Sequence, residues 1–156
     1  MGYFNRIFCK SKEIPDIKMI MDFVNSDFKE AFTNQLNKDL ESQSWNEFEL
    51  YYHKDKSPII VEINRVESSR NLAKEEIEEF KEFIGKPKLF ETKKRKVIRH
   101  LNNTNFIICN QLLSDLDDEG EQVNWSLLRF FERNYEGIIQ VDGQGIFIDE
   151  KYLIKI

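Results

Sequence analysis

The sequence predicts an α+β fold, a single domain in which helices pack on an antiparallel or mixed sheet. Its 156 residues correspond to the length of one domain. Strand-like stretches lie near both ends of the chain, and stripes of apolar residues at helical spacing lie between them. The 13 Phe residues supply a large apolar core, so we expect stability without a disulfide or a metal ion.

The chain begins with a predicted strand and a predicted helix. Residues 3–9 are rich in aromatic and branched side chains, which favours a strand. Pro15 suits the first turn of a helix, and apolar residues recur at helical spacing from Ile17 to Val24. A further stripe at four-residue spacing predicts that helical structure continues: Phe28, Phe32, Leu36 and Leu40.

A β-hairpin is predicted next. Residues 47–53 alternate strictly between an apolar face and a polar face, and Tyr51 falls on the polar face. Residues 54–58 have the composition of a turn, and residues 59–64 form a second alternating stretch. The two stretches are therefore expected to pair.

Two helices are expected in the middle of the chain. The first carries an apolar stripe at Ala73, Ile77, Phe80 and Ile84. Glu75 and Glu76 near its start favour a helix N-terminus, and Gly85 with Pro87 is a strong stop signal. A shorter helix is predicted over 93–101.

The last third of the chain combines strands with one helix. Residues 106–109 predict a strand, 114–121 an acidic loop, and 123–135 a helix that Gly137 ends. Three short strands separated by turn residues follow at 138–141, 146–148 and 152–156.

The order of elements raises the hypothesis of an internal repeat. Residues 1–65 and 104–156 both read as βαββ-type units, joined by a helical connector over 66–103. At an offset of 108 residues, Ile17 and Ile20 align with Trp125 and Leu128. The alternative is that any two amphipathic helices align once the register is free to vary.

Charge and cysteine content limit the classes of partner. The formal charge of −5 argues against bulk affinity for nucleic acid or for anionic membranes. The longest apolar run spans only 106–109, which excludes a transmembrane helix, and no signal-peptide pattern opens the chain. We therefore expect a cytoplasmic protein in which Cys9 and Cys109 are small buried side chains rather than a redox pair.

The acidic segment is the first candidate site. Its carboxylates at Asp115, Asp117, Asp118 and Glu119 could bind a basic protein partner. A calcium loop starting at Asp115 would have suitable residues at its first positions, but Ser126 stands at position 12, where calcium requires a carboxylate. We therefore expect a solvated loop without a metal.

Two aromatic residues complete the predicted partner-binding set. Trp45 precedes the first hairpin strand, and Tyr51 lies on its polar face. Exposed Trp and Tyr are typical interface anchors. The leading interpretation is thus a non-catalytic binding protein without a cofactor, such as a bacterial inhibitor or immunity-type protein that occludes its partner.

An enzyme or small-ligand binder is the main alternative. The element order resembles the paired βαβββ modules of the vicinal oxygen chelate superfamily, whose cavity holds a metal ion. That resemblance would place ligands on inward strand positions, where His53 and Glu62 are the available pair. No catalytic His, Cys or Ser motif is present.

Nucleic-acid binding through residues 86–100 is the other alternative. Seven Lys and Arg residues lie there with His100, but only Phe90 could stack on a base. The basic residues could instead face the acidic helix over 74–82. The sequence therefore predicts a surface that is segregated by charge.

Overall fold

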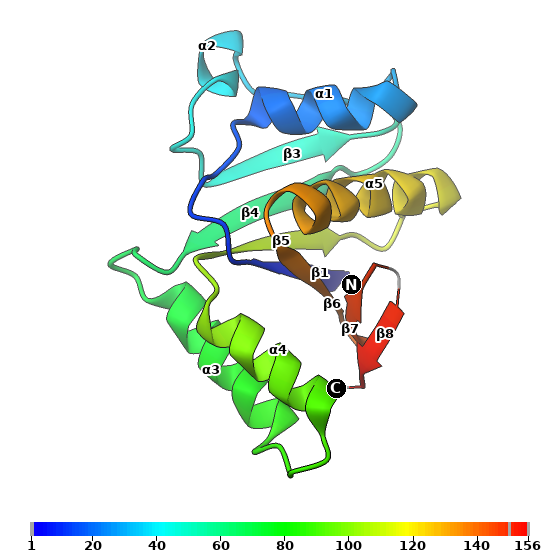
Figure 1. The fold of residues 1–156 in the computed structure, drawn as a ribbon. Coiled ribbons are helices and arrows are strands. Elements are labelled where there is room, and N and C mark those ends of the chain that lie inside the picture. The colour runs from blue at the N-terminus through cyan, green and yellow to red at the C-terminus, as the bar shows by residue number, and fades with distance from the viewer. Residues whose placement is uncertain (1, 150, 156) are drawn as a thin grey trace.

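The computed structural model describes residues 2–149 and 151–155, which form an eight-stranded antiparallel sheet with helices on both faces (Figure 1). The strands are β1 (Tyr3–Cys9), β2 (Phe32–Thr33), β3 (Glu47–Tyr51), β4 (Ile59–Arg65), β5 (Phe106–Leu112), β6 (Gly137–Val141), β7 (Gly145–Ile148) and β8 (Lys151–Ile154). The helices are α1 (Ile17–Asp27), α2 (Asn37–Leu40), α3 (Leu72–Ile84), α4 (Thr92–Asn102) and α5 (Asp118–Asn134). The predicted α+β class and the single domain are confirmed.

The N-terminal strand lies at the centre of the sheet. The strand order is β2-β3-β4-β5-β1-β6-β7-β8. Arg6 of β1 lies opposite Cys109 of β5 on one side and Gln140 of β6 on the other. Pairing of β3 with β4 confirms the predicted hairpin.

Helices α1 and α5 cover one face of the sheet (Figure 1). The Asp16 side chain caps α1 by accepting a 2.8 Å hydrogen bond from the Met19 N–H. The predicted apolar stripe of α1 is buried. It belongs to the larger of the two apolar clusters, together with α5, which has more buried residues than α1. Burial of these stripes is the main stabilisation of this layer.

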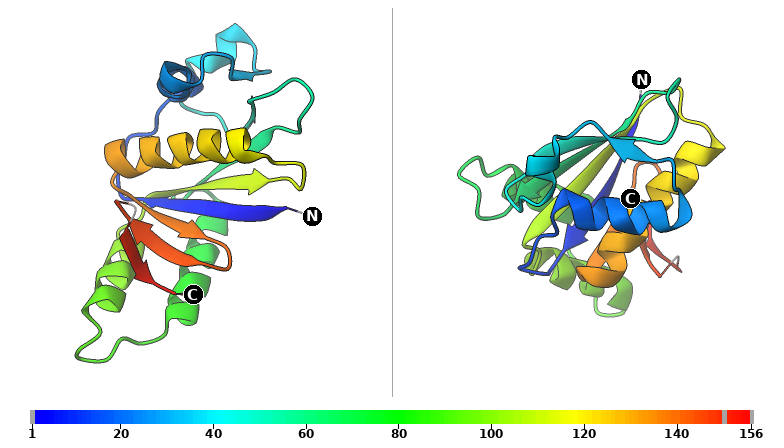
Figure 2. Two further views of the ribbon diagram at one scale, coloured as in Figure 1. Left: turned by 90° about the vertical axis from the view of Figure 1, so that its right-hand side faces the viewer. Right: turned by 90° about the horizontal axis from the view of Figure 1, so that it is seen from above.

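Helices α3 and α4 cover part of the opposite face, as a second view shows from the side (Figure 2). Their apolar stripes pack on Phe8, Ile107 and Ile138 of the sheet. Phe8 contacts Phe80 edge to face, with ring centroids 5.4 Å apart. Both predicted helices are confirmed, α3 beginning one residue before its first predicted stripe residue and α4 at Thr92.

The predicted helical stripe from Phe28 to Leu40 is confirmed only at its end, where α2 covers Asn37–Leu40, and residues 28–36 are not helical. The N–H of Phe28 bonds to the Val24 carbonyl and ends α1. The side-chain amide of Asn25 then donates to the carbonyls of Phe28 and Ala31, at 3.0 and 2.7 Å, and turns the chain back. Residues 32–33 consequently form the edge strand β2, because pairing with β3 satisfies backbone groups that a short exposed helix would leave open.

The strand succession bears on the repeat hypothesis. Residues 1–65 start at the centre of the sheet with β1, cross to the edge at β2 and return towards the centre at β4. Residues 104–156 start at the centre and finish at the opposite edge. A simple duplication would give both units the same succession. The repeat therefore stays a prediction that the topology does not support.

Candidate partner-binding surface

Trp45 is a core residue, which corrects the prediction that it is an exposed anchor. Only 7% of it is exposed, and its indole N–H donates a 2.8 Å hydrogen bond to the Pro15 carbonyl. Its ring also contacts Phe48 edge to face. The hydrogen bond of Trp45 holds the segment before β3 against the start of α1. Because its side chain is buried, Trp45 cannot anchor a partner.

Tyr51 lies at the sheet edge in an aromatic pair that includes a residue the sequence analysis missed. Its ring stacks on Phe32 of β2, with centroids 5.0 Å apart and planes inclined by 6°. The Tyr51 hydroxyl donates to Glu49 Oε2 at 2.6 Å. Phe32 is 46% exposed, so it presents the apolar surface at this edge. Phe32 was missed because its four-residue spacing suggested a helix.

The first half of the predicted acidic loop 114–121 is a loop, and the second half belongs to α5, which begins at Asp118. Asp117 caps α5, its Oδ1 accepting a 2.9 Å hydrogen bond from the Gly120 N–H. Asp115 Oδ2 accepts a 2.8 Å bond from the Ser57 N–H, and this bond lowers the pKa of Asp115. Asp115 therefore holds the β3–β4 turn, and Asp117 holds the start of α5. Both carboxylates have a structural role, whereas the prediction gave them only a role in a partner interface.

Asp118 and Glu119 occupy the first turn of α5 and are exposed to solvent. Carboxylates there are favoured by the positive end of the helix dipole. Of the predicted acidic set, these two are the carboxylates that point to solvent without a structural hydrogen bond among the residues that the structure describes. The described residues contain no group of three or more side chains suited to holding a metal ion.

A hollow of about 200 Å³ lies beside this helix start. Asp27 from the end of α1, Glu30 from the following loop, and Glu119 line it together with Lys29. Tyr52 also lines the hollow and is only 4% exposed. Three acidic residues, two of them only three positions apart in the chain, thus line the same hollow as a buried phenol.

The Tyr52 hydroxyl has no hydrogen-bond partner of good geometry within the described part of the chain, although the Asp117 backbone is close. Burial, assisted by the negative charge of Asp117, raises the pKa of Tyr52, so the phenol is neutral. A buried polar group without a partner costs stability unless something binds it. Tyr52 is not among the predicted site residues, because the alternation along its strand places it correctly in the core.

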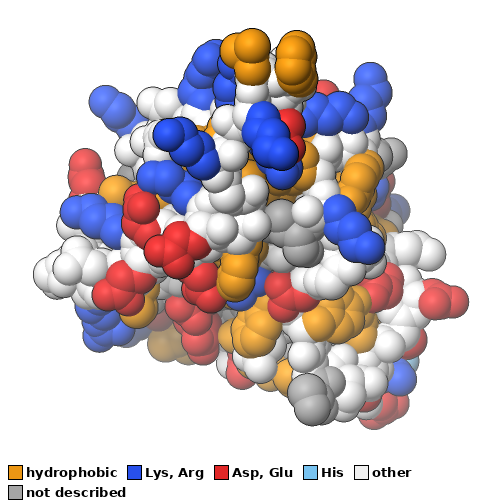
Figure 3. Space-filling model, turned by 90° about the horizontal axis from the view of Figure 1, so that it is seen from below, with side chains coloured by type: hydrophobic (Ala, Val, Ile, Leu, Met, Phe, Trp, Pro, Cys, Tyr) orange, Lys and Arg blue, Asp and Glu red, His pale blue; other side chains and the backbone are white. Residues whose placement is uncertain are grey.

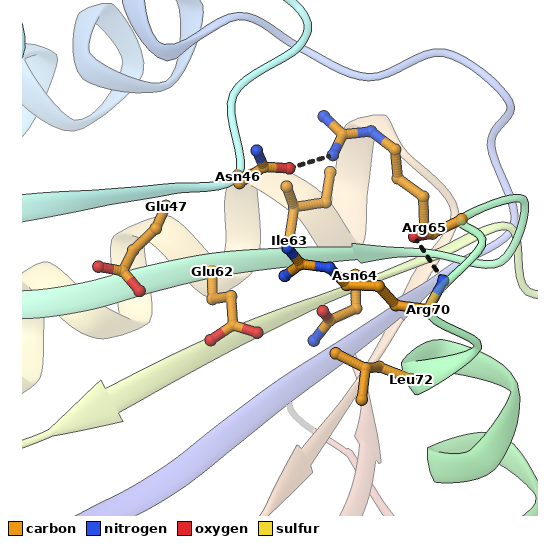
Figure 4. Close-up of a pocket in the computed structure, with 9 residues that line it drawn as sticks. Asn46, Glu47, Glu62, Ile63, Asn64, Arg65, Arg70 and Leu72 are labelled. Carbon is orange, nitrogen blue, oxygen red and sulfur yellow. Dashed lines mark hydrogen bonds between the residues drawn. The ribbon is translucent and has the colours of Figure 1, made fainter.

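A larger depression of about 410 Å³ lies on the part of the sheet that α3 and α4 leave uncovered (Figure 4). Glu47 and Glu62 stand directly opposite each other on β3 and β4, and their side chains point the same way. Arg65 is held at the rim by hydrogen bonds to the Trp45 carbonyl and to Asn46. Arg70 lies along the groove.

The groove does not contain the metal pair that the enzyme alternative required. Glu62 lies opposite Glu47 at the start of β3, whereas His53 follows the far end of β3, where its Nδ1 accepts the Asp55 N–H at 3.0 Å. The nomination of His53 and Glu62 as neighbouring ligands is wrong, because the register of β3 and β4 separates them.

The cysteines behave as the sequence analysis expected. Cys9 is fully buried, and Cys109 is partly buried and forms no disulfide. Burial raises the pKa of Cys109 to about 12. A thiol with that pKa is a poor nucleophile at neutral pH.

The basic segment is not neutralised by the acidic helix, contrary to the second interpretation offered for it. Helices α3 and α4 contact each other through apolar side chains. Of the ion pairs among the described residues, Lys81–Glu78 lies within α3, Lys94–Glu91 lies within the basic segment, and none joins the two helices. Segregation of the whole surface by charge stays a prediction.

No helix in the described residues combines the length and the apolar character needed to cross a bilayer. Comparison with protein families, with curated proteins and with solved structures gives no match.

Proposed function

We propose that this protein is a non-catalytic binding protein that occludes a basic protein partner, as an inhibitor or immunity-type protein does. The hollow beside α5 carries the proposal. Three acidic residues, Asp27, Glu30 and Glu119, line it, and buried Tyr52 forms part of its wall. A Lys or Arg side chain of the partner matches this set, because it supplies hydrogen-bond donors and a positive charge.

The stacked pair of Phe32 and Tyr51 lies next to the hollow along the chain and supplies apolar contact. Ala31 and Tyr52 line the hollow, and the next and preceding residues, Phe32 and Tyr51, form the stacked pair. Binding sites commonly surround a charged contact with an aromatic anchor that excludes water. The partner would therefore cover both the hollow and the exposed ring of Phe32.

The proposed mechanism is steric occlusion. Asp118 and Glu119 would accelerate the approach of a basic surface, since exposed charges act mainly on the rate of association. The partner's Lys or Arg side chain in the hollow, and its contact with the ring of Phe32, would then slow dissociation.

Two measurements test the proposal. The first is calorimetric titration with a short Arg-rich peptide as the probe. The double variant Glu30→Gln/Glu119→Gln should bind the peptide about tenfold more weakly or worse, because both charge-assisted contacts are lost. Glu13→Gln/Glu67→Gln removes the same charge from two exposed positions outside the hollow and should change affinity less than about twofold.

The second measurement addresses inhibition. A photo-crosslinking amino acid at Phe32 should capture one protein from the source cells, and the same group at exposed Leu72 should not. The captured protein, once purified, should lose its activity at a one-to-one ratio with this protein. Equal peptide affinity in both Gln variants, or a captured protein that stays fully active, contradicts the proposal.

A further inference from the structure

The loop between α3 and α4 presents two large apolar side chains to solvent. Leu89 is 75% exposed and Phe90 is 90% exposed. This loop is the part of the α3–α4 hairpin furthest from the sheet, at the bottom of Figure 1 and in the side view of Figure 2. A side chain that is 90% exposed has almost no neighbours, so Phe90 lies on a projection rather than in a groove.

The loop is held in this shape by Glu91. Its carboxylate accepts a 2.7 Å hydrogen bond from the Lys88 N–H and pairs with Lys94 at 3.1 Å. These contacts, the backbone bond first, lower the pKa of Glu91. The Arg95 guanidinium also donates to the Leu89 carbonyl. The exposed apolar pair is therefore preorganised, which lowers the entropic cost of binding.

Basic side chains surround the apolar pair. Seven Lys and Arg residues and one acidic residue, Glu91, lie in residues 86–100, and Glu91 is already paired. Lys86, Lys88 and Lys93 are exposed, and none of the ion pairs found in the described residues includes them. Figure 3, which views this side of the molecule from below, shows Lys and Arg side chains gathered with hydrophobic side chains between them.

We propose that the α3–α4 loop is a peripheral contact site for an anionic lipid surface. Leu89 and Phe90 would enter the headgroup region, and Lys86, Lys88 and Lys93 would lie against the acidic headgroups. Charge complementarity and the convex, apolar tip select this occupant. Single-stranded nucleic acid is a poorer match, because it requires several aromatic platforms along a basic groove, and Phe90 is the one aromatic residue of residues 86–100.

This site is separate from the acidic hollow and does not depend on it. The hollow lies beside the start of α5, on the opposite face of the sheet from the α3–α4 hairpin. The net charge of −5 conceals the basic loop, since screening limits electrostatic attraction to about 10 Å. Local charge therefore decides affinity for a surface that meets the loop first.

The test is co-sedimentation of the full chain with vesicles. Vesicles of phosphatidylcholine mixed with phosphatidylserine should bind the protein at low salt, and vesicles of phosphatidylcholine alone should not. Leu89→Ser/Phe90→Ser should weaken binding by about tenfold or more. Lys86→Glu/Lys93→Glu should weaken it by about fivefold or more for each charge removed.

Matched variants control for general effects. Leu36→Ser alters another exposed apolar residue, and Lys38→Glu/Lys54→Glu reverses two exposed charges outside the loop. Both should bind anionic vesicles as the wild type does. Because all these positions are exposed, circular dichroism and melting temperature should not change. In a Phe90→Trp variant, the added fluorescence should shift to shorter wavelength on anionic vesicles.

Three results would overturn the proposal. The first is no sedimentation with anionic vesicles at low salt. The second is equal loss of binding in the loop variants and in the matched variants. The third is binding to a single-stranded oligonucleotide that is tighter than to anionic vesicles and is lost in Lys86→Glu/Lys93→Glu, which would assign the loop to nucleic acid. The peptide titration of the acidic hollow is unaffected by any of these outcomes.

Discussion

Asn110 and Asn124 face each other between the sheet and α5, joined by a 2.9 Å hydrogen bond in a fully buried environment. Asn110 belongs to β5 and lies opposite Asn5 of β1, and Asn124 is in the second turn of α5. Asn110 Nδ2 donates this bond to Asn124 Oδ1, while Asn110 Oδ1 and Asn124 Nδ2 have no partner among the described residues. The single bond therefore offsets part of the cost of burying two amides and orients α5 on the sheet.

Replacing Asn124 with Leu should lower the free energy of unfolding by about 1–3 kcal/mol, because the Asn110 amide stays buried without its partner. The double variant Asn110→Leu/Asn124→Leu should lose less than the sum of the two single variants, as both polar groups are then gone. Urea denaturation of all four proteins measures the coupling. Gln122→Leu, at an exposed position of α5, is the control and should stay within about 0.5 kcal/mol of wild type. A cost for Asn124→Leu no greater than that of Gln122→Leu would show that the pair contributes nothing.

Trp45 should affect stability and leave binding intact. Trp45→Phe removes the hydrogen bond to the Pro15 carbonyl and part of the ring volume, so the free energy of unfolding should fall by about 1–3 kcal/mol. Affinity for the Arg-rich peptide should be unchanged below the melting transition. Weaker peptide binding at an unchanged free energy of unfolding would contradict this prediction and show that Trp45 takes part in partner binding.

Gly120 should resist substitution although it lies in a helix. A Cβ there would stand 2.6 Å from Tyr52 Cζ and 2.5 Å from Leu116 Cδ1. Alanine improves helix propensity by about 1 kcal/mol, but forcing these side chains apart costs about 1–3 kcal/mol. We expect Gly120→Ala to be less stable than wild type in thermal denaturation and to bind the peptide more weakly. Adding Tyr52→Leu should recover part of the stability, and a Gly120→Ala protein that is more stable than wild type would refute the steric argument.

The contribution of Glu76 to the free energy of unfolding should decrease as pH rises. Its carboxylate pairs with Arg6 beneath α3, yet burial raises the pKa of Glu76 above its ordinary value of 4.5. The folded state therefore holds this proton more tightly than the unfolded state does. The stabilisation is complete below pH 4.5 and is lost as pH rises through the folded pKa.

Glu76→Gln removes this titration. The free energy of unfolding of the variant, relative to wild type, should improve steadily from about pH 4 to about pH 7. Urea denaturation across that range measures the difference. With Arg6→Met as the background, the pKa of Glu76 rises further and the slope should become steeper. A difference that moves in favour of wild type with rising pH would show that the Arg6 pair outweighs burial.

Elements with a complete local signal could be predicted from the sequence. Helix α3 combines a buried stripe with Gly85 and Pro87 at its end, and the β3–β4 hairpin combines strict alternation with a turn. In each case period and boundary residues agree, which is when local reasoning is reliable.

Other features depend on contacts between distant parts of the chain. Phe32 joins the sheet edge because the Asn25 side chain ends the preceding turn, and Trp45 is buried because the Pro15 carbonyl offers an acceptor 30 residues away. The acidic hollow likewise assembles from α1, the loop after it, β3 and α5. Periodicity in the sequence cannot predict such long-range contacts, because it shows which face of an element is apolar and not which other element packs against that face.

The central position of β1 governs how the protein can fold during synthesis. Cys9 pairs with Phe106 and Gly137, so the first strand leaves the ribosome roughly a hundred residues before its nearest neighbour exists. At cellular rates of translation this delay is about 5–20 s. During that interval residues 3–9 are an apolar segment without a partner, and chaperones recognise such segments. We therefore expect this segment to need protection by chaperones until β5 emerges.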